Sequence, residues 1–304
     1  MKLKKHQLIV AVLMAALGVI MFSAKAVMVK MAYAYNVDSV TLLLLRMSMA
    51  LPIYIVIASI ESSKKNRSKL KSKDYYSLIA LGILGYYLAS YLDFEGLKHL
   101  SAGMERLILF IYPTLVVIIS ALFLKQRINK YQIRAIIITY LGVFIAFYKY
   151  SSLSDSSTNI PLGALLIFGS ALSYAIYLVG SGDLIPRIGS VRFTAYAMIV
   201  SCTAVILHYI IMGNGSDVFN QVPQVYALGA AMAIISTVIP SFLLSEAIKR
   251  IGAANVAIIG SLGPISTIVL AVIFLGEVIT IYQAIGTFIV ILGVLLIMLK
   301  KEKG

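Results

Sequence analysis

The sequence has little charge, a single cysteine and no tryptophan. Only 12% of its 304 residues are Asp, Glu, Lys or Arg, whereas 61% are hydrophobic. A soluble domain of this length needs a polar surface that so few charged residues cannot provide. Cys202 alone excludes a disulfide framework, and three scattered histidines (His6, His99 and His208) make no metal-ligand motif. We therefore expect no metal and no cofactor.

What the sequence has instead is long apolar runs, which recur along the whole chain. Each can cross the roughly 30 Å of hydrocarbon in a bilayer as a helix. A membrane barrel would show short segments of alternating polarity, and a soluble all-α protein would carry more charge. The first run resembles a signal peptide, but it is long and has a counterpart later in the chain. We therefore interpret it as a transmembrane helix that is not cleaved off. The fold class predicted is all-α integral membrane, with ten transmembrane helices over 7–29, 39–59, 75–93, 102–124, 131–149, 160–181, 191–212, 224–245, 253–275 and 280–299.

The positive charges predict the orientation of these helices. Twenty of the 26 Lys and Arg residues fall in the termini and in alternate loops, all on one side if the chain crosses ten times. Lys and Arg concentrate on the cytoplasmic side of membrane proteins. Both termini are therefore expected in the cytoplasm and the protein in the cell membrane. The net charge of +14 reflects this topology and does not indicate a nucleic-acid partner.

The chain also contains an internal repeat with a period of 151 residues. The matching pairs are Lys98 with Lys249, Ala102 with Ala253, Pro113 with Pro264, and Phe123-Leu124 with Phe274-Leu275. The predicted organisation is a first repeat at 1–150, a linker at 151–159 and a second repeat at 160–304. Because each repeat has five helices, an odd number, equivalent segments lie on opposite sides of the membrane. This inverted-topology repeat is typical of secondary transporters.

Several motifs in the two repeats resemble the EamA domains of the drug/metabolite transporter superfamily. They are L-K-H-L-S-A-G-M-E-R-L-I-L-F-I-Y-P (97–113) and L-K-Q-R-I (124–128) in the first half, and K-R-I-G-A-A (249–254) and F-L-G-E-V-I (274–279) in the second. Arg46, an arginine early in the second predicted helix, also matches the family pattern. The sequence departs from the family pattern at Gln126, where the second copy keeps the acid as Glu277. The resemblance implies a ten-helix transporter whose fourth and ninth helices line a central pathway and whose fifth and tenth pack peripherally.

Charged residues within a span are costly and are therefore candidate functional residues. Arg46, Glu105 and Arg106 are predicted to face the substrate pathway. Arg46 could instead form a structural ion pair with Glu105 or Asp93, and the Glu105-Arg106 doublet could anchor at the interface. Their equivalents in the second repeat are uncharged, as is Ile176, the equivalent of Lys25. For Lys25 we favour a side chain that extends to the outer surface.

Polar and acidic residues nearby complete the predicted site. The further pathway candidates are Tyr87, Ser90, Tyr91, Tyr112, Tyr174 and Asn255, although tyrosine also belongs at membrane interfaces and serine often permits close helix packing. Glu105, Glu95 and Asp93 are possible proton carriers. Pro113 and Pro264 each remove a backbone donor and are predicted hinges, or fixed kinks, in their helices.

The function predicted is a secondary transporter, and an exporter in direction, for a small polar or amphipathic metabolite such as an amino acid. A channel or a lipid flippase is the alternative. An integral-membrane enzyme is disfavoured because the sequence has no paired intramembrane histidines and no metal-binding motif. The partners expected are a small-molecule substrate and the lipid bilayer, and the sequence leaves the oligomeric state open.

Overall fold

The structure is a computed structural model and describes residues 5–63, 70–123, 130–148, 159–212, 218–260 and 262–299. All regular secondary structure in these residues is helical. Seven helical stretches in these ranges are long and apolar enough to cross a membrane, and three shorter apolar helices accompany them. A helical segment covers the middle of each of the ten predicted ranges. The segments are α1 (Lys5–Tyr33), α2 (Ser39–Ser62), α3 (Ser72–Gly82), η1 (Ile83–Leu88), α4 (Ala89–Leu97), α5 (Ala102–Leu109), α6 (Tyr112–Phe123), α7 (Lys130–Phe147), α8 (Ile160–Ile188), α9 (Ser190–Met212), α10 (Pro223–Ala233), η2 (Ile234–Val238), α11 (Ile239–Ile259), α12 (Leu262–Leu275) and α13 (Ile281–Leu299).

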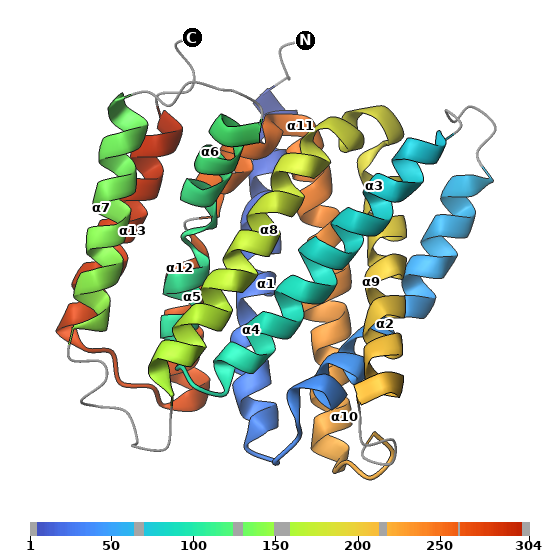
Figure 1. Cartoon of the computed structure of the whole chain (residues 1–304), viewed down its shortest axis with the longest axis horizontal. Helices are drawn as coiled ribbons and strands as arrows, with labels where there is room; N and C mark the ends of the chain where they lie inside the picture. The colour runs from blue at the N-terminus through green and yellow to red at the C-terminus, as the bar shows by residue number, and fades with distance from the viewer. Residues whose placement is uncertain are drawn as a thin grey trace.

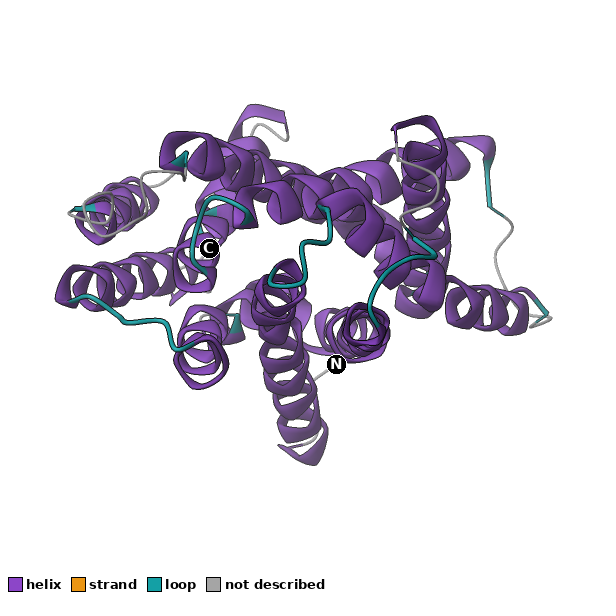
Figure 2. Cartoon of the chain, turned by 90° about the horizontal axis from the view of Figure 1, so that it is seen from below, coloured by secondary structure: helices purple, strands orange, loops and turns teal. Residues whose placement is uncertain are grey.

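The helices form one bundle, and the described chain begins and ends at the same edge of it (Figure 1). α7 and α13 lie side by side at one end of the bundle in both views, apart from the central helices (Figures 1 and 2). Glycine allows their close approach, because a Cβ atom added to Gly286 would lie 2.5 Å from the carbonyl oxygen of Gly142. This is the peripheral position that the resemblance implied for the fifth and tenth predicted helices.

Two segments of π-helix interrupt the third and eighth predicted helices. η1 begins at Ile83 and η2 begins at Ile234, so the two irregularities are 151 residues apart and occupy the same position in the repeat. In η2 the cause is visible in the sequence, since Pro240 follows it and cannot donate the hydrogen bond to residue 236 that an α-helix would need. η1 has Ala89 at the equivalent position, so no proline accounts for its π-helical conformation.

The two predicted hinge helices are both broken next to their prolines. α5 ends at Leu109 and α6 begins at Tyr112, just before Pro113. The second break lies between α11, which ends at Ile259, and α12, which begins at Leu262, two residues before Pro264. Both prolines thus lie beside a break in their helices, and their role as hinges stays a prediction.

Two predicted loops are wrong. α11 continues as helix across residues 246–252, where a loop between the eighth and ninth spans was expected, and α8 extends seven residues beyond its predicted end at 181. At the end of α8 only Gly189 separates it from α9, with a φ of 90° that favours glycine. The start of α8 follows the sequence more closely, because the Asn159 side chain caps it by accepting a hydrogen bond from Leu162 N.

Candidate functional site

An ion pair between Lys25 on α1 and Asp93 on α4 lies at the centre of the bundle. The Lys25 Nζ atom is 2.6 Å from Asp93 Oδ2, and the two residues are only 3% and 1% exposed. The prediction that Lys25 extends to the outer surface is therefore wrong. A buried charge is costly without a partner, and Asp93, placed within reach by α4, supplies one.

Glu105, on α5, lies beside this pair. Its side chain is fully buried, and neither carboxyl oxygen receives a hydrogen bond. The charged groups close enough to act on it are Asp93, Lys25 and Arg106. A carboxyl group buried without hydrogen bonds is unstable as an anion, which makes Glu105 a group able to bind a proton.

Arg106, the next residue on α5, points toward α1 and α12. Its Nη2 atom donates a hydrogen bond of 2.9 Å to Ser23 Oγ, and Ser23 Oγ also lies 3.3 Å from the carbonyl oxygen of Gly263. Thr267 on α12 donates to the carbonyl oxygen of Ser23. Both residues of the Glu105-Arg106 doublet are buried, so neither anchors at an interface, and Arg106 joins one broken helix to the other through α1.

Arg46, on α2, lies on the other side of the ion pair. It is 2% exposed, its Nε atom donates to Thr237 Oγ1 at 2.7 Å, and its guanidinium carbon lies 5.4 Å from the centre of the Phe94 ring. Its Nη1 atom is buried without a hydrogen-bond partner. The predicted alternative, a structural ion pair with an acid, is thus not what holds the guanidinium in this position.

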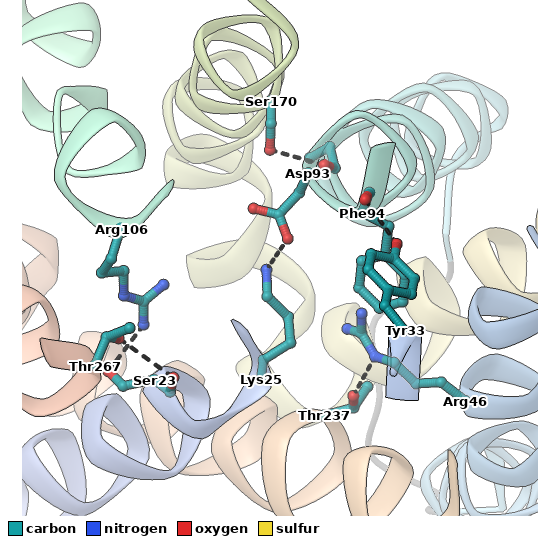
Figure 3. Close-up of polar contacts among 11 residues, drawn as sticks. Ser23, Lys25, Tyr33, Arg46, Asp93, Phe94, Arg106, Ser170, Thr237 and Thr267 are labelled. Carbon is teal, nitrogen blue, oxygen red and sulfur yellow. Dashed lines mark hydrogen bonds and ion pairs between the residues drawn. The ribbon is translucent and has the colours of Figure 1, made fainter. Parts of the chain in front are cut away.

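Figure 3 shows these groups in a row, with Lys25 and Asp93 between Arg106 and Arg46. Phe22 lies under two of the cations, 5.1 Å from Lys25 Nζ and 5.2 Å from the guanidinium carbon of Arg106. We call the five buried charged residues Lys25, Arg46, Asp93, Glu105 and Arg106 the charge cluster. It holds three cations and two carboxyl groups, so it carries at least one surplus positive charge.

The predicted tyrosines gather in two places rather than in one pocket. Tyr87 and Tyr91 both contact His208 of α9, where the Tyr87 hydroxyl lies 3.0 Å from His208 Nδ1 and the Tyr91 ring packs at 4.8 Å. Tyr112 packs edge-on against Tyr174 with ring centres 5.2 Å apart. The second group continues from Tyr174 to Tyr177 and from Tyr177 to Tyr86.

Three other predicted residues have no hydrogen bond or ion pair with the charge cluster among the described side chains. Glu95 accepts hydrogen bonds from Ser39 and Lys98, so it is engaged near the end of α4. Ser90 is buried on α4. The Asn255 side chain lies outside the described residues.

Four residues that hold the cations were not predicted from the sequence, namely Ser23, Thr237, Phe22 and Phe94. Ser23 could have been identified from the sequence, because a serine two residues before a lysine inside an apolar span is a candidate partner for buried charge. The repeat could have pointed to Thr237, because Thr237 is the equivalent of Tyr86, which lies 151 residues earlier. The two phenylalanines are indistinguishable from core residues in the sequence.

Glu277, the acid that fits the family motif, has a structural role. Its two carboxyl oxygens accept hydrogen bonds from Ala102 N at 2.8 Å and Gly103 N at 3.3 Å. Ser101 caps the same helix end by accepting from Met104 N. Glu277 therefore links the second half of the chain to the first turn of α5, the segment that carries Glu105 and Arg106.

Comparisons with known proteins agree with this architecture. The chain is 33% identical over 283 residues to the uncharacterized transporter YcbK of Bacillus subtilis, covering 91% of this chain and 90% of that protein. It is 28% identical to the uncharacterized transporter YyaM of the same organism, covering 79% and 78% of the two chains. A solved crystal structure matches with a TM-score of 0.67 at 17% identity, over 95% of this chain and 96% of that chain, which shows a shared fold alone.

The family model supplies the assignment. The model of the EamA-like transporter family matches the chain twice, at residues 9–148 and at residues 161–299. Together with the apolar helices, these matches make the chain a multi-pass membrane protein. It belongs to the EamA-like transporter family.

Proposed function

We propose that the protein is a secondary transporter that exports a small polar or amphipathic metabolite, such as an amino acid, across the cytoplasmic membrane by alternating access. The observation that carries the proposal is the charge cluster, five ionisable side chains buried at the centre of a membrane bundle. Buried charge of this kind is costly, and in membrane proteins it marks substrate and ion pathways. The predicted tyrosines Tyr87, Tyr91, Tyr112 and Tyr174 line the same pathway in this proposal.

The backbone supplies places where the helices can bend. α5 and α6 meet at a break, as do α11 and α12, and π segments interrupt two more helices at equivalent positions. π segments and prolines interrupt the regular hydrogen-bond ladder and are frequent at functional sites. In our proposal, bending at Pro113 and Pro264 opens the pathway to one side of the membrane at a time.

The proposal keeps the predicted topology of ten crossings and two inverted repeats, at 1–150 and 160–304, with both termini in the cytoplasm. The equivalent π segments and the position of both described ends at one edge support it. Single cysteines introduced into a variant with Cys202 replaced test it directly. In intact cells an impermeant maleimide should react with cysteines at 276–281 and not with cysteines at 61–73, which should react only after the cells are permeabilised.

Coupling to protons is assigned to Glu105 in this proposal. Asp93 is held by an ion pair with Lys25, and Glu95 by Ser39 and Lys98, whereas the Glu105 carboxyl group has no such cation or hydroxyl donor among the described residues and lies beside Asp93. A site that takes up a proton on one side and releases it on the other needs a carboxyl group without a fixed partner. Glu105 meets that condition better than the other two acids.

Reconstitution into liposomes tests the transport function. Purified protein should move at least one member of a panel of amino acids and related metabolites, and an imposed proton gradient should change the rate. Flux far above carrier rates would indicate a channel, and movement of labelled lipid between leaflets would indicate a flippase. If no panel member moves under any proton gradient, the proposed substrate class is wrong.

A further inference from the structure

Arg46 is held in one orientation while part of its guanidinium group remains available. Its Nε atom is bound to Thr237 Oγ1 at 2.7 Å and its flat face lies over the Phe94 ring. In Figure 3 the terminal nitrogens point away from α2, toward the side where Lys25 and Asp93 lie. Nη1 has no hydrogen-bond partner, although the residue is 2% exposed. An unpaired donor on a buried cation is costly, so its retention indicates a partner that this conformation does not supply.

The π segment η2 explains why Thr237 is placed to hold Arg46. The Thr237 hydroxyl donates to the carbonyl oxygen of Met232, five residues earlier, at 2.9 Å. With its proton engaged there, the oxygen is left as an acceptor, and it accepts from Arg46 Nε. The bulged backbone therefore fixes the hydroxyl, and the hydroxyl fixes the guanidinium.

The equivalent position in the other half is built differently. Arg46 corresponds to Ala197, and Thr237 corresponds to Tyr86, whose hydroxyl lies 3.0 Å from that of Tyr177. Ala197 packs in a cluster of apolar residues and tyrosines. A positioned arginine thus occurs at only one of the two related sites, which is expected of a substrate contact and not of the shared scaffold.

The charge around Arg46 indicates what the missing partner is. Asp93, the acid that acts electrostatically on Arg46, is already 2.6 Å from Lys25. Outside the cluster, the other buried charged groups among the described residues are Glu61, Asp74 and Arg192. Glu61 lies near the end of α2, and Asp74 and Arg192 lie near the starts of α3 and α9. One surplus positive charge remains when both cluster acids are ionised. The surplus is two when Glu105 is protonated. In either state a carboxylate lowers the surplus positive charge and matches the geometry of a guanidinium group.

We propose that the transported substrate carries a carboxylate that binds Arg46 Nη1, and that Thr237 is the residue that positions Arg46 for it. This inference rests on the proposed transport function and adds the chemical class of the substrate. It assigns Arg46 to recognition of the anionic group and gives η2 a role in specificity. A substrate lacking the carboxylate leaves Nη1 unpaired and is rejected.

The test uses matched probes in liposomes that contain the full-length protein. Each probe set shares one side chain: leucine, leucinamide and 4-methylpentanoate form one set, and phenylalanine, phenylalaninamide and 3-phenylpropanoate form another. Compounds that keep the carboxylate should be transported, or should compete with a transported compound, whereas the amides should do neither. Transport of amides as fast as the matching acids overturns the inference and leaves the transporter intact. Transport of no probe in any gradient, while another member of the metabolite panel without a carboxylate moves, also overturns the inference. If no probe and no panel member moves, the proposed substrate class fails with it.

Variants assign the recognition to residues. Arg46→Gln should raise the KM for the carboxylate probe by about 10- to 100-fold, the effect of one charged hydrogen bond. Thr237→Val should also raise KM with little change in the maximal rate, and Thr237→Ser should restore it. Arg46→Lys keeps the charge but lacks the planar guanidinium group, and it should show an intermediate KM. It provides a second variant if Arg46→Gln does not fold. Lys249→Gln removes an exposed cation as the matched control. An unchanged KM in a folded Arg46 variant, or no rescue by serine at 237, overturns the assignment.

Discussion

The two halves of the chain share their irregular backbone but not their charges. η1 and η2 begin 151 residues apart, and both broken helices are interrupted just before the repeated proline. The four span charges of the first half that we compared correspond to Ile176, Ala197, Val256 and Ala257 in the second. Features kept in both halves are those that let helices bend, whereas the residues of the charge cluster all lie in the first half. Movement and recognition are thus separated in this sequence.

Exchanging residues between the halves tests this separation, and the charge pair gives the largest effect. Asp93 corresponds to Leu244, and Lys25 to Ile176. Asp93→Leu alone leaves Lys25 buried without a partner and should destabilise the protein by about 3–5 kcal/mol. Thermal unfolding in detergent and the yield of monodisperse protein measure this effect.

The double variant Lys25→Ile/Asp93→Leu provides the control, because it gives the first half the apolar pair of the second. Replacing a buried ion pair by apolar residues is often neutral for stability. The double variant should therefore recover most of the lost stability while transport remains absent. Recovery of transport along with stability would show that the pair is structural and would remove it from the site.

Glu105 tests whether the acid of the first half carries the proton. Glu105→Gln keeps the shape of the side chain but cannot ionise. Transport driven by a proton gradient should be lost, whereas exchange of substrate across liposomes without a gradient should continue at a rate that no longer depends on pH. A variant that retains the pH dependence of the wild type would exclude Glu105 as the carrier. Glu95→Gln is the matched control, since Glu95 is engaged by Ser39 and Lys98 and should change little.

Much of this architecture was predictable from the sequence, because membrane helices are encoded by long apolar runs and broken by proline. The positions of the helices followed directly, and both helices expected to bend at Pro113 and Pro264 are broken close to the proline. The loop predicted at 246–252 failed because Lys249 and Arg250 looked like a solvent-exposed turn, whereas they pair with Glu246 along one continuous helix. Local charge pairs of this kind stabilise a helix as readily as they mark its end.

The candidate site was only partly predictable. Its charged residues were found because ionisable groups stand out in apolar spans, but their partners were not. Lys25 was expected to extend outward because the sequence gives no sign that α4 brings Asp93 to within 2.6 Å of it. The two tyrosine groups likewise depend on which helices are neighbours, since Tyr87 and His208 are far apart in the chain. Pairings between helices are set by tertiary packing, which one sequence does not reveal.

The prolines test the part that the halves share. Pro113→Ala and Pro264→Ala each supply the missing backbone donor, which allows the helix to close across its break. Each variant should be more stable by roughly 1 kcal/mol. If opening requires the break, a barrier higher by a similar amount slows turnover about fivefold. The two variants should behave alike in thermal unfolding and in liposome transport. A strong effect at one proline and none at the other would contradict a common role.

The acid that caps α5 tests a place where the halves differ in backbone as well as in sequence. Glu277 accepts from the first amides of α5, but the equivalent residues 253 and 254 lie inside the continuous helix α11 and leave no helix end to cap. The acid equivalent to Glu277 is absent too, since position 126 is glutamine. Glu277→Gln keeps an acceptor and should cost about 0.5 kcal/mol through the lost charge at the helix start. Glu277→Ala removes both and should cost about 1–2 kcal/mol in thermal unfolding. Equal losses in the two variants would mean that the negative charge, and not the hydrogen bonds, holds α5.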